Sequence, residues 1–222
     1  QLNVAEFNPL IPLKGLPCWP SEPNWKQIKD SDKLKGINLE ETPNPLKVKP
    51  QPLKRGKDFD IVVLGISVAA LPAISQELIN DKKNPRFKAM IDNSATVQTQ
   101  AFQLWMNQDL SLGLKWKFNP NSVMGTYVEP LDTYCDMSHL IPRENWPPEV
   151  NLQSIAYFCG VLEDKAGQTQ ASTDKEAYKN AISYLKKDSA GIWPAVKSND
   201  FNWDWLVDPK NGKGAKRFDS QY

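Results

Sequence analysis

Proline is the residue that most constrains how this chain of 222 residues can fold. Nine of its 18 prolines fall within the first 52 residues, at positions 9, 12, 17, 20, 23, 43, 45, 50 and 52. Each proline removes a backbone N–H donor and fixes φ, so long helices are excluded from this stretch and central strands are disfavoured. Residues 1–57 are therefore expected to be irregular.

The rest of the composition is that of an ordinary globular chain, with 40% hydrophobic and 24% charged residues. Lys and Arg number 27 and Asp and Glu 26, a formal net charge of +1. Such a balance creates no global field that would recruit nucleic acid or an anionic membrane. The apolar runs are also much shorter than the roughly 20 residues of a membrane helix. We expect no nucleic-acid partner and no integral membrane segment.

The cysteines and the histidine limit the chemistry further. Cys18, Cys135 and Cys159 are odd in number and widely spaced, which argues against a disulfide framework and predicts reduced thiols in the cytoplasm. With one His and no Cys-x-x-Cys pair, the chain cannot assemble a zinc site of the usual kind. No metal site is predicted.

A short apolar run at residues 61–66 gives the strongest local pattern. It follows Asp58 and Asp60, and its continuous apolar character predicts a strand buried on both faces, as in a parallel sheet. Residues 68–79 then have helical spacing, with Pro72 suited to a first turn. Together they predict a strand, a tight turn and a helix, half of a βαβ unit.

Later segments predict further strands and one clear helix. Apolar and polar residues alternate over residues 95–106, and residues 154–162 form a second apolar, aromatic run. Thr173 and Glu176 have the spacing of a capping box for a helix that ends at Lys187. The remaining elements that we expect are a short strand at 125–129, a turn entering a short helix within 130–141, and a surface turn at 212–217. The predicted fold class is α/β, α+β in detail, with a mixed β-sheet, packing helices and a long Pro-rich irregular N-terminal segment.

Several segments, taken in order, resemble a large group of FAD-dependent oxidoreductases. The group includes the flavin amine oxidases and the phytoene-desaturase-like proteins. The segments read GLPCWPSEP at 15–23, DFDIVVLGISVAALP at 58–72, TVQTQAFQLW at 96–105, SIAYFCG at 154–160 and RFDSQY at 217–222. The resemblance implies hydride transfer from a C–N or C–C bond of a small-molecule substrate to flavin.

Two hallmarks of that group are missing. Its members open with a Gly-x-Gly-x-x-Gly loop that holds the FAD pyrophosphate at a helix N-terminus, and they close with a Gly-Asp segment near the flavin. The resemblance therefore implies an internal segment, with residues 1–67 part of the FAD-binding domain and residues 68–222 the substrate-binding domain. The stretch alone is expected to be inactive and not to retain FAD, and its main partner would be the remainder of the flavoprotein.

The resemblance also suggests which residues approach cofactor and substrate. The turn of Gly65, Ile66 and Ser67 would approach the dinucleotide; the alternative is a buried turn without a ligand. The substrate-cavity candidates are Gln100, Gln103, Trp105, Tyr127 and Tyr157, with His139 as a polar anchor that Asp136 could orient. For each of these, pairing within the sheet, core packing or a surface position is the simpler interpretation. No residue is assigned as the acid or base.

Two hypotheses from other classes stay open. The eight Trp and the prolines would also suit a non-enzymatic module that binds sugars, polyproline or partner chains through aromatic surfaces. A third hypothesis is a segment that is stable only against the rest of its parent protein. Its signature would be a large exposed apolar patch.

Overall fold

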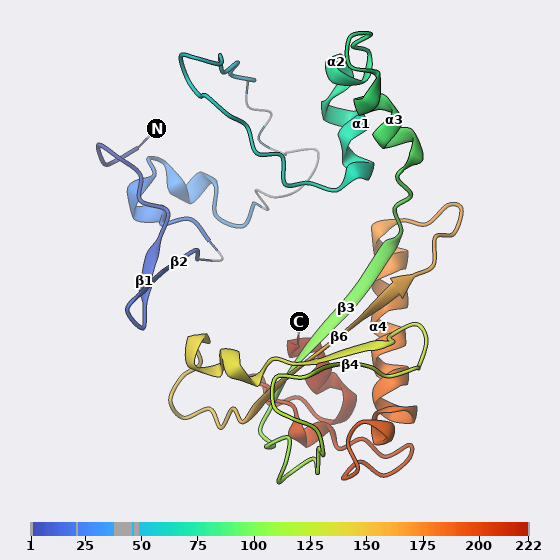
Figure 1. Cartoon of the computed structure of the whole chain (residues 1–222). Coiled ribbons are helices and arrows are strands. Elements are labelled where there is room, and N and C mark those ends of the chain that lie inside the picture. Colours follow the sequence, from blue (N-terminus) through green and yellow to red (C-terminus); the bar gives the residue numbers. More distant parts are fainter. Residues whose placement is uncertain (1, 21, 38–45, 47–48, 222) are drawn as a thin grey trace. The chain divides into compact units, whose positions relative to one another are not determined.

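The computed structural model describes residues 2–20, 22–37, 46 and 49–221. The chain divides into two compact units, Gln1–Ile91 and Asp92–Tyr222, which are coloured blue to green and green to red in Figure 1. The boundary expected after residue 67 falls inside the first unit. Tyr222, the last residue of the resembling C-terminal segment, lies outside the described residues.

Within residues 1–57, the part that the structure describes has little regular structure, as the prolines predicted. Strands β1 (Ile11–Leu13) and β2 (Leu16–Cys18) form a small antiparallel hairpin. Its turn residues Lys14 and Gly15 both have positive φ, 47° and 80°, a conformation that glycine adopts without steric cost. Two short 3-10 helices follow, Trp25–Gln27 and Ser31–Lys33.

The prediction of a buried strand in the apolar run at residues 61–66 is wrong. Residues 61–65 form no regular secondary structure, and the side chains of Ile61, Val62 and Val63 are 81%, 68% and 92% exposed. A continuous apolar run becomes a buried strand only where neighbouring strands and covering layers receive it. No described strand pairs with it, so the predicted βαβ half is absent from the described part of the chain.

The helix predicted at residues 68–79 is present as three short pieces. They are a 3-10 turn at Val68–Ala70, α1 (Leu71–Ile74) and α2 (Gln76–Ile79), and they are followed by α3 (Pro85–Asn93). Pro72 lies in the first turn of α1, as predicted. Ser75 separates α1 from α2 with φ −127° and ψ 35°, which is not a helical conformation.

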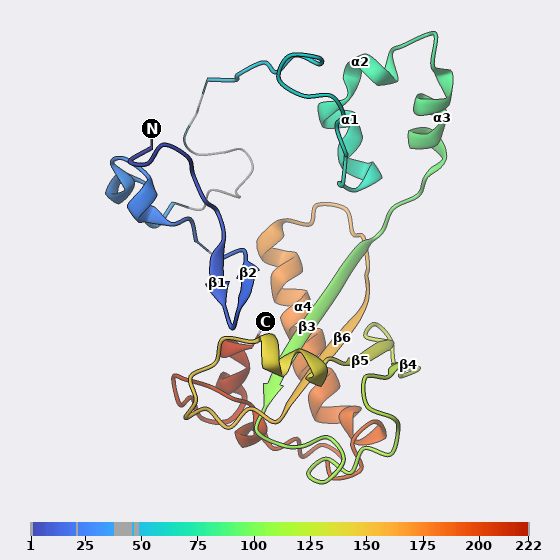
Figure 2. The same cartoon turned by 60° about the vertical axis from the view of Figure 1, so that its left-hand side comes forward.

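The second unit is built on a four-stranded antiparallel sheet. Its strands are β3 (Gln98–Met106), β4 (Val123–Gly125), β5 (Thr133–Asp136) and β6 (Ser154–Leu162), in the order β3-β6-β5-β4. β3 and β6 pair along their whole length, from Gln98 opposite Leu162 to Met106 opposite Ser154. Figure 2 shows these two strands as the long axis of the unit. The strands predicted at 95–106 and 154–162 are confirmed.

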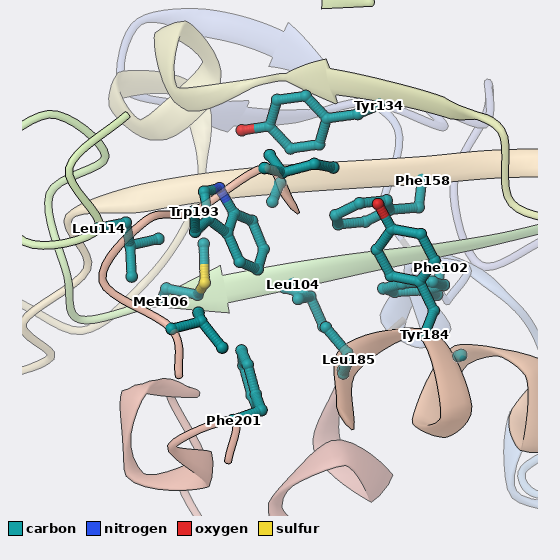
Figure 3. Packing of buried hydrophobic residues seen from close by; sticks show 14 of the residues in the cluster. Phe102, Leu104, Met106, Leu114, Tyr134, Phe158, Tyr184, Leu185, Trp193 and Phe201 are labelled. Carbon is teal, nitrogen blue, oxygen red and sulfur yellow. The ribbon is translucent and has the colours of Figure 1, made fainter. Parts of the chain in front are cut away.

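One face of this sheet, here called the inner face, carries the core. Alternate residues of β3 and β6 point to it, and Phe102 stacks on Phe158 with ring centroids 4.7 Å apart. Helix α4 (Gln170–Lys187) buries Ala181, Tyr184 and Leu185 in the same cluster. Further buried side chains from the neighbouring strands and the C-terminal segment complete it (Figure 3): Leu104, Met106, Leu114, Tyr134, Trp193 and Phe201. The expected combination of a sheet with packing helices is confirmed.

Helix α4 begins one turn earlier than the capping pattern predicted. The Thr169 side chain accepts from the backbone N–H of Ser172, and the Ser172 side chain accepts from the backbone N–H of Thr169. Glu176, predicted to complete the cap, instead pairs with Lys165 at 2.6 Å. Two consecutive pairs of residues, Thr169 with Ser172 and Thr173 with Glu176, have the spacing of a capping box, and the prediction chose the later pair.

The region between β3 and β6 differs most from the predicted elements. The strand expected at 125–129 ends at Gly125, because Tyr127 has φ 57°, a left-handed conformation that a strand cannot continue through. The turn and helix expected within 130–141 are strand β5 followed by a 3-10 helix at Ser138–Arg143. Gly160 of β6 fits closely here, since a Cβ at this position would lie 1.7 Å from the carbonyl oxygen of Pro130.

The C-terminal segment closes one end of the free edge of β3. The backbone N–H of Trp105 donates to Oε1 of Gln221, and the carbonyl of Trp105 accepts from the N–H of Val207, both at 2.8 Å. The Arg217 guanidinium donates to the carbonyl of Leu206 from Nε and Nη2, at 3.0 and 2.7 Å. From Gly214 onward, the surface turn predicted at 212–217 is instead a 3-10 helix, Gly214–Ser220, which fastens the tail to the sheet.

Asp208 anchors this tail as a buried carboxylate. Its Oδ1 accepts from the hydroxyl of Ser220 and the N–H of Lys210, at 2.6 and 2.9 Å, and its Oδ2 accepts from the N–H of Gly212 at 2.6 Å. The Ser220 hydroxyl, these amides and the charge of Arg217 outweigh the effect of burial and lower the pKa of Asp208 below its ordinary value of 3.8.

Replacing Phe158 with Ala should lower the free energy of unfolding by about 3–5 kcal/mol, because the ring is fully buried and leaves a cavity. Val161 lies on the same strand but is half exposed, so Val161→Ala should cost less than about 1 kcal/mol. Urea unfolding followed by tryptophan fluorescence compares the two variants. Equal losses would contradict this assignment of the core.

Replacing Asp208 with Asn should lower the free energy of unfolding by about 1–2 kcal/mol near neutral pH. Because the pKa of Asp208 is lower in the folded state, its carboxylate stabilises the fold at pH values above 3.8. This stabilisation is lost as the pH falls through the folded-state pKa. Urea titrations over a series of pH values should show the gap from the wild type closing in acid. The exposed Asp200, changed to Asn, is the control; a gap that stays open in acid contradicts the assignment.

Candidate functional site

The second face of the sheet, here called the outer face, is not filled by α4. Six of its side chains come from three strands: Ala101, Gln103, Trp105, Cys135, Tyr157 and Cys159. At one end Ile155 is fully buried, whereas at the other end Val161 is 50% exposed. The outer face is therefore a graded surface that is closed at one end and open at the other.

Strand register places the outer-face residues in rows. Gln103 lies opposite Tyr157, Tyr157 opposite Cys135, and Cys135 opposite Val123. The next row joins Ala101 on β3 to Cys159 on β6. Directly opposed residues of antiparallel strands have Cβ atoms about 4.5–5.5 Å apart. An amide, a phenol and two thiols thus form one continuous patch.

Trp105 marks the closed end of the patch. Its indole packs edge-to-face against Trp146, with ring centroids 5.7 Å apart and an interplanar angle of 60°. Its Nε1–H is buried and has no acceptor among the residues that the structure describes. An unpaired buried donor costs about 1–3 kcal/mol, and an acceptor delivered here would recover it.

Cys135 and Tyr157 on the outer face are neutral at physiological pH, because the pKa of each is raised. Burial raises the pKa of the Cys135 thiol, and the nearby Cys159 adds to the rise. Burial also raises the pKa of Tyr157, with further contributions from Cys159 and Cys135. Because the thiolate is the reactive form of cysteine, Cys135 is poorly suited to be a nucleophile. These groups can contact a ligand as neutral donors and apolar surface.

Gln100, a predicted cavity residue, lies instead on the inner face and is 5% exposed. Its Nε2–H donates to the carbonyl of Val161 at 2.9 Å, and its Oε1 accepts from Nδ2 of Asn180 at 3.0 Å. Both ends of the amide are occupied within the fold. Gln100 therefore joins β3, β6 and α4, and its role in a substrate cavity stays a prediction.

Two other predicted residues lie outside the strands of the patch. Tyr127 is 97% exposed in the loop after β4, and His139 is exposed in the 3-10 helix that follows β5. Asp136 does not orient His139, because its two oxygens accept from the backbone N–H groups of Asn121 and Ser138. The predicted Asp136–His139 pair is wrong, since the strand turns Asp136 inward.

Gly65, Ile66 and Ser67, predicted to approach the dinucleotide, lie in the exposed stretch of the first unit. A Cβ at Gly65 would meet no atom within 4 Å, so no cradle surrounds it. The helix after them, α1, has only four residues. These residues do not fit an FAD phosphate site as they stand, and their cofactor role stays a prediction.

A second surface feature escaped sequence analysis. An open depression of about 430 Å³ lies along residues 195–205 and Gly214. Half-buried Trp203 and Trp205 line it together with exposed polar side chains. The Trp- and Asp-rich composition of this stretch was the available signal, but composition does not show that the side chains share a hollow. Cys135 and Cys159 of the outer face, and Trp146 next to Trp105, were likewise not among the predicted site residues. Alternation along β6 indicated the position of Cys159 alone.

Comparison of the chain with protein-family models, with curated proteins and with solved structures found no match. Among the described residues, no three or more His, Cys, Asp or Glu side chains are grouped so that they could hold a metal ion. None of the helices in the described part of the chain combines the length and the apolar character needed to span a bilayer.

The two glutamines of β3 should respond differently to truncation. Gln100→Ala leaves the carbonyl of Val161 and the amide of Asn180 unpaired, and should lower the free energy of unfolding by about 1–3 kcal/mol. Gln103→Ala on the outer face should change it by less than about 0.5 kcal/mol. Urea titration of both variants measures the difference. Equal losses would show that Gln103 is also structural.

Proposed function

We propose that residues 92–222 are the substrate-binding portion of an FAD-dependent oxidoreductase resembling the flavin amine oxidases, with the outer face turned towards the substrate. One observation carries the proposal: Gln103, Trp105 and Tyr157, three residues suggested by the resemblance, lie together on the one sheet face that the core does not use. Oxidation of a C–N or C–C bond would be the chemistry of the flavin, which accepts the hydride.

The residues of this chain would bind and position the substrate. Gln103 offers an amide donor and acceptor, and the neutral Tyr157 offers a hydroxyl in the adjacent row. Trp105 supplies an apolar wall at the closed end of the patch, with its indole N–H buried. Such a surface is mostly apolar with a few polar groups that fix orientation, as small-molecule sites usually are.

One further feature supports a surface completed by other polypeptide. The exposed apolar run at residues 61–66 has five apolar side chains that are each at least 45% exposed. Runs of this kind are typical of interaction surfaces. The three cysteines are unpaired thiols, which suits the proposed cytoplasmic location.

A comparison of flavin content tests the proposal. The 222-residue chain should purify without flavin, whereas the complete open reading frame that contains it should yield a yellow protein with FAD near one per chain. Visible absorbance of both preparations, with flavin identified after release by chromatography, makes the measurement. A complete product without flavin, or the 222-residue chain alone with stoichiometric FAD, would refute the proposal.

Thiol labelling then tests the orientation of the outer face. Cys135 and Cys159 should react with N-ethylmaleimide several-fold more slowly in the FAD-loaded complete protein than in the 222-residue chain, because the flavin domain would cover them. Mass spectrometry of the labelled peptides gives both rates. Unchanged rates would show that another surface faces the flavin.

A second candidate function, a non-enzymatic binding module, is favoured by the depression along residues 195–205. Its aromatic side chains are half-buried rather than fully packed. Acrylamide quenching distinguishes the half-buried indoles of Trp203 and Trp205 from buried ones. Trp116 and Trp193, which are 5% and 0% exposed, represent the buried kind. Quenching confined to the first unit would speak against a binding role for this depression.

A further inference from the structure

We infer that the depression along residues 195–205 is a binding site for a polyhydroxylated ligand of the sugar class. The inference is independent of the flavoprotein proposal, since it concerns a different surface of the second unit. Its lining combines two indoles with carboxylates, an amide and an ammonium group: Lys197, Asp200, Asn202, Trp203, Asp204 and Trp205.

The two indoles that line the depression, Trp203 and Trp205, both pack against one buried ring. Phe201 is buried and packs edge-to-face against both Trp203 and Trp205, with ring centroids 5.0 and 5.8 Å apart. Both indoles are only half-buried, so part of each remains open to solvent. A flat apolar surface of this kind packs against the C–H groups of a sugar ring.

The backbone of this segment is fastened on both sides. The N–H of Asn107 donates to the carbonyl of Trp205 at 2.9 Å, and its side-chain Nδ2 donates to the carbonyl of Asp204 at 2.9 Å. The side chain of Asn202 accepts from the N–H of Asp204 at 3.1 Å, which fixes the turn. A site ordered before binding loses less conformational entropy when the ligand arrives.

The polar groups of the depression are not used by the fold. In the described part of the chain, neither carboxylate, of Asp200 or of Asp204, accepts a side-chain or backbone hydrogen bond or forms an ion pair, and the ammonium of Lys197 has no partner. The Nδ2 of Asn202 is likewise uncommitted, because only its Oδ1 is engaged. The depression therefore offers free donors and free acceptors side by side.

This mixture identifies the ligand chemistry. Hydroxyl groups donate and accept at once, so a sugar satisfies carboxylate acceptors and amide or ammonium donors together. A quaternary ammonium ligand would use the indoles and the two carboxylates, but Lys197 in the same lining would repel it. An anion would meet Asp200 and Asp204. The volume of about 430 Å³ lies within the range of small-molecule sites.

Saturation-transfer NMR on the 222-residue chain tests the inference directly. The probes are glucose, galactose, mannose, cellobiose and maltose, with tetramethylammonium as the cationic alternative and glycerol as a polyol without an apolar ring face. At least one sugar should bind, and glycerol should not. Binding of tetramethylammonium alone, of all the polyols alike, or of none of the probes would overturn the inference.

Variants then locate the binding. Asp200→Asn and Asp204→Asn alter exposed side chains without partners, so both variants should unfold like the wild type. Each should lower the affinity for the sugar about tenfold. Trp203→Ala should abolish the signal, and Trp19→Ala, at a tryptophan that is 77% exposed in the first unit, should leave it unchanged. Sugar binding that persists in the Asp and Trp203 variants would place the ligand elsewhere and refute the site.

Discussion

The antiparallel pairing of β3 with β6 is the constraint around which the second unit is organised. The two strands match residue for residue from Gln98 opposite Leu162 to Met106 opposite Ser154. Since side chains alternate along a strand, this register assigns every residue to one face, and a shift of one position would exchange the faces. The stacked rings of Phe102 and Phe158 lie on the inner face and tie the register to the core.

The two faces consequently have different tasks. The inner face is completed by α4 and by the segment around Trp193, and both ends of the Gln100 amide on this face are hydrogen-bonded. The outer face is buried at its closed end, where Trp105 packs against Trp146, and open at its other end, where Val161 is half exposed. The C-terminal segment forms hydrogen bonds to one end of the free edge of β3, through Gln221 and Val207. The end of the edge at Trp105 is thereby protected from pairing with other chains.

This arrangement leaves two surfaces with polar groups that have no partner among the described residues. The outer face offers a patch with a buried indole N–H that lacks an acceptor, and the depression at residues 195–205 offers half-buried indoles beside unpaired carboxylates. Both are fixed by the same strand, because β3 carries Trp105 and its C-terminal end leads to Asn107, which holds the 204–205 backbone. A change in the β3–β6 register would alter both surfaces.

Periodicity in the sequence was enough to predict the strands at 95–106 and 154–162 and the helix ending at Lys187. The same alternation separates Gln100 from Gln103. The prolines were enough to predict the irregular N-terminal stretch. Partners distant along the chain settled the rest. Residues 61–66 have strand-forming side chains, but no described strand pairs with them, and they stay irregular and exposed. Alternation placed Gln100 and Gln103 on opposite faces, but only the position of α4 made the face of Gln100 the interior. Periodicity states which residues share a face, whereas burial of that face depends on what packs against it.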